Sequence, residues 1–318
     1  MLSILGFVEV FLKTGFVYSL LAMGYYVSYT ILDFPDLTVE GTFLSGAVVF
    51  GLLITHGVNA WLALLLSFLF GAACGALTGF LHVKLHIRPL LCGILVSTAL
   101  ISLNLVAVSA GMMGDFRGEA TSTINYGRSA ATLHNVFPAN LIPARVGGIG
   151  LRDLILFLCI ALLFKFLLDA FLSTKRGLLL RATGNNTQFV TTLSEDAGNN
   201  KILGLAIGNG FAAVSGALYS HISGNVNQSM GLGTVVIGLA SLIIGLSVFH
   251  KLHRMRATTK AILGAIIYQF CLVAVNKLGV PTAYNKFVMA GLFVLALIFS
   301  EKIKRKNAKT DKGGEKNA

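Results

Sequence analysis

Long, nearly continuous apolar segments alternate with short polar stretches along the whole chain. Nine such segments lie at about 14–32, 41–56, 60–82, 90–110, 153–171, 202–223, 232–249, 261–279 and 286–301. A helix needs about 20 mostly apolar residues to cross the hydrocarbon core of a bilayer, whereas the strands of a membrane barrel alternate apolar and polar residues. The pattern therefore predicts an all-α polytopic membrane protein with about 9–10 transmembrane helices in the lipid bilayer.

An acidic stretch separates the first two apolar segments. It holds Asp33, Asp36 and Glu40, with Pro35 among them. Proline breaks a continuous helix, and a carboxylate is costly in hydrocarbon. Two interpretations stay open: the stretch borders water or a polar interior, or it is an interfacial loop in which Asp36 or Thr38 caps the next helix.

A short motif occurs in both halves of the chain. Gly41-Thr42-x-x-x-Gly46 follows the acidic stretch, and Gly233-Thr234-x-x-x-Gly238 follows the polar stretch 225–231. The copies lie five helices apart in the predicted order, so the second copy would be inverted relative to the first, as in many transporters. Coincidence is the alternative in a chain with 35 glycines. A real repeat would mark 33–46 and 225–238 as discontinuous helices beside a central pathway.

The charge distribution indicates how the chain is oriented. Its formal net charge is +12, and most of its Lys and Arg residues fall in the segments 82–89, 173–201, 250–260 and 301–318. These segments lie on one side of the membrane in the predicted order. Because cytoplasmic loops are enriched in Lys and Arg, we expect these segments and the C-terminus to be cytoplasmic, in a plasma-membrane protein. No basic face with stacking aromatic residues indicates a nucleic acid partner.

We expect one transmembrane domain over 1–301 and a basic, disordered cytoplasmic tail over 302–318. The loop 111–149 is expected outside and the loop 173–201 inside. Residues 2–12, with Glu9 and Lys13 four residues apart, are interpreted as an interfacial segment before the first crossing.

The sequence offers no set of catalytic residues. It lacks a nucleotide-binding P-loop, a zinc-protease motif and a nucleophile elbow, so we predict no enzyme activity and no cofactor. All four cysteines sit inside apolar segments and are expected to be buried and inert. His82 and His86 have metal-ligand spacing but no third ligand nearby, so no metal site is predicted. The helices offer a pathway without a visible energy source.

The polar stretch 173–201 bears a family resemblance. The run T-K-R-G-L-L-L-R-A-T-G-N-N at 174–186, then Gly198 and I-L-G-L-A-I-G-N-G-F-A-A-V-S-G-A-L, resemble a cytoplasmic loop and the following helix in branched-chain amino acid type permeases of bacterial ABC importers. The likeness extends to F-P-D-L-T-V-E-G-T-F-L-S-G-A near the start and covers almost the whole membrane region. It is closest to an amino-acid branch with some members linked to aromatic amino acids, and sugar permeases are more distant.

The resemblance implies that this loop contains a coupling helix, which docks in a groove of a cytosolic ABC ATPase subunit. Its expected residues are Arg181, Ala182, Gly184, Asn185, Phe189, Val190, Leu193, Glu195 and Gly198. Phe189, Val190 and Leu193 would expose apolar groups to the cytosol, which fits a docked partner; a helix lying back on the membrane surface is the alternative.

Two functions from different classes follow. The first is the permease subunit of an ATP-driven importer, working as a dimer, with an external substrate-binding lipoprotein that delivers an amino acid or similar small polar solute; a sugar is the alternative solute. The second is a self-contained secondary transporter or channel. The residues that we expect along the path are Asp33, Asp36, Glu40, Asn104, Asn209, His221, Asn225 and Asn227.

Overall fold

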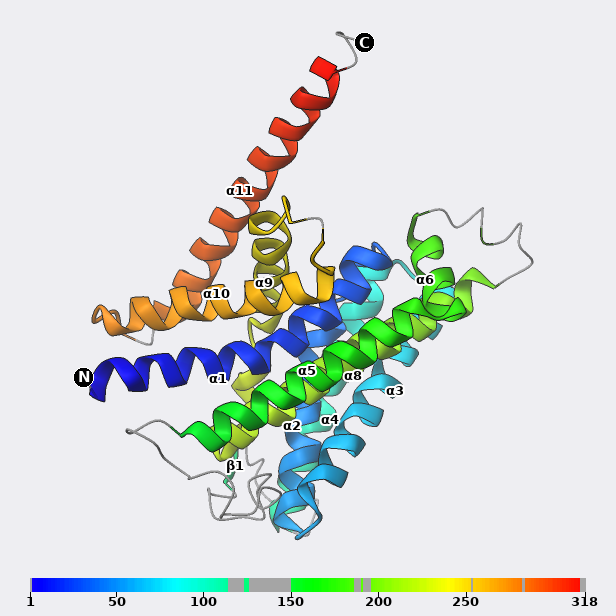
Figure 1. The fold of residues 1–318 in the computed structure, drawn as a ribbon. Coiled ribbons are helices and arrows are strands. Elements are labelled where there is room, and N and C mark those ends of the chain that lie inside the picture. Colours follow the sequence, from blue (N-terminus) through cyan, green and yellow to red (C-terminus); the bar gives the residue numbers. More distant parts are fainter. Residues whose placement is uncertain are drawn as a thin grey trace.

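The structure is a computed structural model that describes residues 2–113, 123–125, 150–185, 190, 196–252, 254–281 and 284–314. Its helices are α1 (Leu2–Tyr25), the π-helix η1 (Tyr26–Ile31), α2 (Thr38–Thr55), α3 (Ala60–Lys84), α4 (Pro89–Met113), α5 (Leu151–Ser173), α6 (Lys175–Asn185), α8 (Ala197–Ser223), the 3₁₀-helix η3 (Gln228–Gly231), α9 (Thr234–Val248), α10 (Ala257–Lys277) and α11 (Asn285–Gly314). Two short strands, β1 (Thr123–Asn125) and β2 (Asn225–Asn227), complete the described elements (Figure 1).

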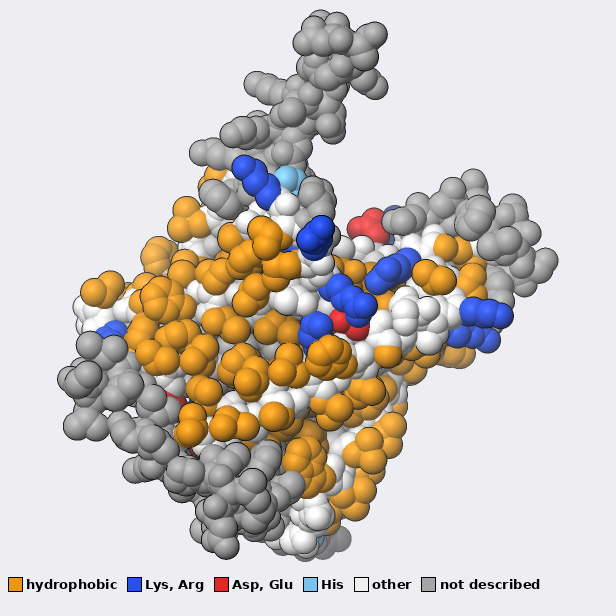
Figure 2. Space-filling model, in the orientation of Figure 1, with side chains coloured by type: hydrophobic (Ala, Val, Ile, Leu, Met, Phe, Trp, Pro, Cys, Tyr) orange, Lys and Arg blue, Asp and Glu red, His pale blue; other side chains and the backbone are white. Residues whose placement is uncertain are grey.

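Eight of the described helical segments are long and apolar enough to cross a membrane, and the apolar part of α11, Asn285–Ile298, is a shorter ninth. The predicted all-α polytopic fold is confirmed. Large apolar side chains are exposed on α3, α4, α5 and α11, as expected for surfaces that face lipid or a membrane partner (Figure 2). Cys159 is also exposed, on α5, so the expectation that all four cysteines are buried was wrong for that residue.

The structure at both ends of the chain differs from the sequence prediction. The predicted interfacial segment 2–12 is part of one helix, α1, which continues through η1 as the first span, Gly6–Ile31. At the other end α11 continues as a helix to Gly314, whereas the sequence predicts a disordered tail from residue 302. Five Lys and one Arg are among the eleven residues 302–312, and both residue types have high helix propensity.

Helix α8 occupies the centre of the bundle and packs against α1, α2 and α3. Glycines make these close approaches possible. A Cβ on Gly216 of α8 would collide with the carbonyl oxygen of Phe43, and a Cβ on Gly46 of α2 would collide with that of Ala213. At the crossing of α1 and α8, a Cβ on Gly24 would lie 2.6 Å from the Gly208 oxygen.

The helix contacts follow an approximate two-fold pattern. In one half α8 packs on α2 and α3, and α2 packs on α4. In the other half α1 packs on α9 and α10, and α9 packs on α11. The first span ends and α8 begins at the same end of the bundle, so the two halves run in opposite directions. The repeated motifs occupy matching places. Gly46 contacts Ala213, and Gly238 contacts Leu21. The separation along the chain between Leu21 and Ala213 equals that between Gly46 and Gly238. These contacts support an inverted repeat rather than a coincidence.

The ends of the basic segments meet at one end of the bundle. Gly198, at the start of α8, lies against Val83 near the end of α3. Arg256, just before α10, forms an ion pair with Asp169 near the end of α5. The structure therefore brings the segments 82–89, 173–201 and 250–260 together, as the charge distribution predicts. We call this the basic end of the bundle.

Candidate functional site

The first helix break, residues 32–37, separates the first span from α2. Asp33 adopts a positive φ of 52°, and Pro35 prevents the helix from continuing. The Asp36 Oδ1 atom then accepts a hydrogen bond of 2.8 Å from the backbone N–H of Thr38, the first residue of α2. A carboxylate at this place pairs a free amide and complements the helix dipole. The predicted break is confirmed, and the Asp36 carboxylate, one residue before the N-cap Leu37, pairs the first amide of α2.

Asn209 on α8 holds the capped start of α2. Its Nδ2 atom donates to the Asp36 Oδ2 atom at 2.6 Å, and its Oδ1 atom accepts from the Thr42 hydroxyl at 2.8 Å. Asp36, Thr42 and Asn209 are all buried, at 2% exposure or less. Thr38 adds a hydroxyl contact of 2.9 Å to Thr78 on α3. This buried network fixes α2 to both α8 and α3. The sequence singles out Thr38 and Thr42, but it does not predict their hydroxyl contacts with Thr78 and Asn209.

The second helix break, residues 224–233, separates α8 from α9. Gly224 and Gly233 both have positive φ, and the Asn227 side chain caps η3 by accepting from the Ser229 N–H at 2.9 Å. The β2 strand in this break pairs antiparallel with β1, so a described piece of the predicted external loop covers it. The rest of the loop 114–149 lies outside the described residues.

The two breaks meet at Glu40. Its Oε1 atom, on the first turn of α2, accepts a hydrogen bond from the backbone N–H of Gly233, which immediately precedes α9. The Gln228 Nε2 atom in the second break donates to the Ile101 carbonyl of α4 at 2.9 Å. The two discontinuous segments predicted from the sequence are therefore neighbours, linked by a carboxylate at a helix N-terminus.

The other residues predicted along the path are scattered. Asp33 and Asn227 are exposed, Asn225 is partly buried, and Asn104 is buried on α4. His221 is buried on α8, where its ring lies edge-on between Phe50 and Phe157, with ring centroids 6.1 Å from each. The structure thus brings Asp36, Glu40 and Asn209 together around the breaks, and it places His221 and Asn104 in packing positions.

Helix α6 contains the opening residues of the predicted coupling loop, and it is fastened to the first break. A Cβ on Gly184 would collide with the Ile31 carbonyl, at the end of the first span. Leu180 is fully buried, and a Cβ on Gly204 of α8 would lie 2.8 Å from it and 2.6 Å from Leu32. Glycine at 184 and 204 thus allows α6, the first break and α8 to meet closely.

The remaining residues of the predicted coupling loop lie in different environments. Arg181 is exposed, Ala182 is partly buried, and Gly198 receives an Asp196 cap at the start of α8, with 2.8 Å between the Gly198 N and the Asp196 Oδ1. Val190 is fully buried, so the expectation that it presents an apolar group to a partner was wrong. Phe189, Leu193, Glu195 and the side chain of Asn185 lie outside the described residues.

A charged cluster at the basic end was missed in the sequence. Asp169 on α5 accepts from the Thr258 hydroxyl at 2.7 Å and forms ion pairs of 3.1 Å with Lys165 and Arg256. It thereby joins α5, which leads into α6, to the start of α10. A carboxylate and a lysine four residues apart inside an apolar segment were the signal that could have found this cluster, because charges in membrane helices are usually functional or paired.

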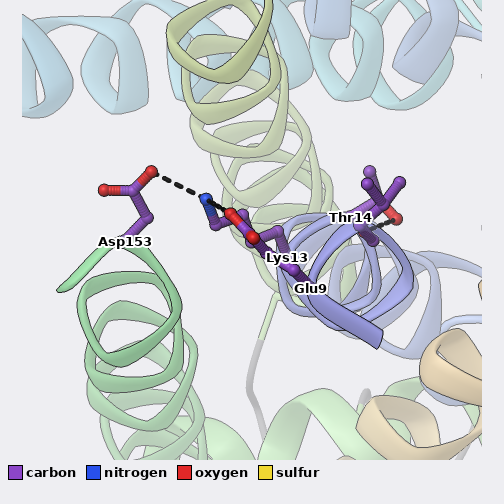
Figure 3. A network of polar contacts seen from close by, with 5 residues as sticks. Glu9, Lys13, Thr14 and Asp153 are labelled. Carbon is purple, nitrogen blue, oxygen red and sulfur yellow. Dashed lines mark hydrogen bonds and ion pairs between the residues drawn. The ribbon is translucent and has the colours of Figure 1, made fainter. Parts of the chain in front are cut away.

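A second ionic cluster lies at the opposite end of the bundle. The Lys13 ammonium on α1 lies 2.5 Å from Glu9 and 2.7 Å from Asp153, at the start of α5 (Figure 3). The side chains of Lys13, Glu9 and Asp153 are 13%, 20% and 32% exposed. The Glu9–Lys13 spacing seen in the sequence is therefore part of a contact between two spans.

Comparison with known proteins agrees with this architecture. Residues 7–297 match the model of the family described as branched-chain amino acid transport system / permease component. The chain belongs to this permease family. The permease is 35% identical to the tyrosine transport system permease protein of Clostridioides difficile, over 92% of the permease and 91% of the relative.

Two further relatives are more distant. The permease is 27% identical to an uncharacterized protein of Rickettsia prowazekii, over 87% of this chain and 91% of the relative. It is also 27% identical to the nucleoside ABC transporter permease protein NupC of Lactococcus lactis, over 82% and 80% of the two chains. No solved structure gives a significant match to the permease. As a member of an ABC permease family, it is a multi-pass membrane transport component that works with ATPase partners.

The contact between Glu40 and Gly233 leads to the first prediction. Glu40→Leu should slow ATP-driven uptake by about tenfold, because it leaves the Gly233 N–H without its acceptor at a partly buried site. Glu40→Gln should retain most of the activity, since its amide oxygen can still accept that hydrogen bond. The activity of both variants is measured as the initial uptake rate in proteoliposomes with equal permease content. Wild-type uptake in Glu40→Leu would show that this contact does not matter for transport.

Proposed function

We propose that the permease forms the solute path of an ATP-driven importer for an amino acid, with an aromatic amino acid such as tyrosine as the first candidate. It works as a dimer, with the basic end of the bundle and the C-terminus in the cytoplasm. Cytosolic ATPase subunits dock on the loop 173–201, and an external binding protein delivers the solute at the opposite end. The 35% identity to a tyrosine permease supports the choice of solute class.

One observation carries the coupling part of this proposal: α6 packs directly against the end of the first span. Gly184 lies against Ile31, and the capped start of α2 follows a few residues later, at Asp36–Thr38. Asn200 on α8 also reaches the Thr183 hydroxyl of α6, with 3.4 Å between the Asn200 Nδ2 and the Thr183 Oγ1. A displacement of α6 by an ATPase would therefore move both the first break and α8.

The path itself is proposed to run beside the two breaks. Backbone amide and carbonyl groups can face a pathway only where a membrane helix is interrupted, and in transporters such interruptions mark solute sites near the middle of the membrane. In this permease both interruptions meet at Glu40 and Gly233. Glu40 and Asn227 retain partial or full exposure within the single chain, whereas Asp36 and Asn209 are enclosed. We therefore assign a structural role to Asp36 and Asn209 and a path-facing role to Glu40 and Asn227.

The test is transport by the complete assembly. The permease is reconstituted into proteoliposomes with its ATPase subunits and its binding protein, and uptake of labelled tyrosine, leucine, a nucleoside and ribose is measured with and without ATP. We expect ATP-dependent uptake of tyrosine, competed by other aromatic amino acids.

Each alternative has its own outcome in the same assay. ATP-dependent uptake of the nucleoside or ribose, without amino acid uptake, would reject the proposed solute. Uptake that continues without ATP, or with an ATPase variant that cannot hydrolyse it, would instead favour a self-contained transporter or channel.

A further inference from the structure

A polar cavity of about 530 Å³ opens at the basic end of the bundle, where α5, α6, η1 and the start of α10 meet. Its polar lining comes from Tyr26, Asp169, Ser173, Arg181, Arg256 and Thr258. Charged side chains gather over this meeting point, on a face that is otherwise mostly hydrophobic (Figure 2). The cavity is separate from the two helix breaks, so the proposed path does not account for it.

The cavity has an excess of positive charge. Asp169 is already neutralised, because its carboxylate accepts from Thr258 and pairs with Lys165 and Arg256. Arg181, on the α6 side, forms no ion pair with any residue that the structure describes. The guanidinium groups of Arg181 and Arg256 thus line the cavity. The carboxylate in the lining, Asp169, is enclosed, with a side-chain exposure of 6%. Guanidinium groups bind phosphate and carboxylate oxygens with paired hydrogen bonds.

Two further groups on the cavity wall can donate hydrogen bonds. The Tyr26 side chain is 9% exposed and lines the cavity. Ala257 and Thr258 form the first turn of α10, whose leading amides have no partner within the helix. The Tyr26 hydroxyl can donate a hydrogen bond to an oxyanion bound in the cavity. The amides and dipole of the helix start also favour an anion.

One exposed apolar side chain lies at the cavity. Leu178 on α6 lines it and is 56% exposed, whereas Leu172, at the end of the α5 span, lines it but is buried. A basic pocket between membrane helices, at the level where the apolar spans end, suits the headgroup of an anionic lipid, whose acyl chains would cover Leu178. The 530 Å³ volume also exceeds what a single small ion needs.

We propose that this cavity binds a phosphate group, held by Arg181 and Arg256 with Tyr26 and the start of α10 as further donors. The phosphate can come from the headgroup of an anionic phospholipid or from free phosphate in solution. Bound there, it joins α6 to α10 across the cavity. Occupancy therefore stabilises α6, which opens the predicted coupling loop, in the position seen here.

The experiment uses the full chain, purified and delipidated in detergent, and native mass spectrometry with added dioleoyl phosphatidylglycerol or dioleoyl phosphatidylcholine. Three variants are compared with the wild type: Arg181→Gln, Tyr26→Phe and the control Arg88→Gln. Arg88 is an exposed arginine in the loop between α3 and α4 and lies outside the cavity lining. The thermal midpoint of each variant checks that it is folded. We expect phosphatidylglycerol to bind at least about tenfold more weakly to Arg181→Gln, and measurably more weakly to Tyr26→Phe, with no change for Arg88→Gln.

A competition arm with inorganic phosphate separates the two sources. Displacement of the lipid by millimolar phosphate indicates a site that takes the free anion as well. Retention of the lipid under the same conditions indicates a headgroup site that also uses the acyl chains. Equal phosphatidylglycerol binding by Arg181→Gln and wild type overturns the proposal. So does equal binding of phosphatidylcholine and phosphatidylglycerol to the wild type together with no effect of phosphate.

Discussion

Replacing Asn209 by leucine should reduce ATP-driven uptake at least tenfold and lower the thermal stability of the permease. The change removes the amide that donates to Asp36 at 2.6 Å, and it also removes the acceptor of the Thr42 hydroxyl. Asp36 would remain buried with a lone bond from the Thr38 N–H among the contacts described. A lost hydrogen bond to a charged buried group costs about 1.5–3 kcal/mol, which is a large part of a typical folding free energy of about 5–15 kcal/mol. Uptake in proteoliposomes and thermal unfolding in detergent measure the two effects.

The exchange of the two side chains is the matched control. In the double variant Asp36→Asn/Asn209→Asp, the amide introduced at position 36 can accept from the Thr38 N–H and donate to the carboxylate introduced at position 209. That carboxylate can in turn accept from the Thr42 hydroxyl, so the bonds around the start of α2 are retained while the link from Asn209 to the Leu205 carbonyl is lost. We expect the exchange to recover much of the stability lost in Asn209→Leu. A double variant whose loss equals the sum of Asp36→Asn and Asn209→Asp would show that the pair does not act together.

The sequence predicted the local features of this network, and the structure supplied the long-range ones. Pro35 and the carboxylates beside it indicated a helix break, because proline and a buried charge act through their immediate surroundings. The partner of Asp36 lies on α8, far along the chain, and a single sequence contains no signal that pairs the two. For that reason Asn209 was predicted to line the path, although it lies enclosed against α2.

The same limit applies to the residues near α6. The predicted exposure of Val190 was an inference from local apolar pattern, and the structure buries that side chain completely. Whether an apolar residue in a loop faces a partner or the protein's own helices depends on packing that periodicity does not describe. Small residues were more informative. The repeated Gly-Thr motif indicated that the two breaks are related, and its second glycine, at 46 and 238, allows close helix contacts in both halves.

Replacing Gly184 by valine should abolish uptake while ATP hydrolysis by the assembled complex continues. A Cβ at this position collides with the Ile31 carbonyl, which is backbone and cannot rotate away, so α6 must move from the end of the first span. Overpacking of this kind typically costs about 1–3 kcal/mol when the structure can relax. The most accessible relaxation separates α6 from the first break, and this separation would disconnect the ATPase from the path. Uptake and phosphate release, measured on the same proteoliposomes, report the two activities.

The control for Gly184→Val is Gly291→Val on α11, where a Cβ meets no atom within 4 Å. Both variants add the same branched side chain to a helix, so a general loss of helix stability would affect both. A specific effect at 184 should leave the Gly291 variant with near wild-type uptake and a normal ratio of ATP hydrolysed to solute imported. Equal ratios in the two variants would mean that the contact between α6 and Ile31 does not transmit the work of the ATPase. A parallel loss of hydrolysis and uptake in Gly184→Val would place its effect on assembly with the ATPase instead of on transmission to α2.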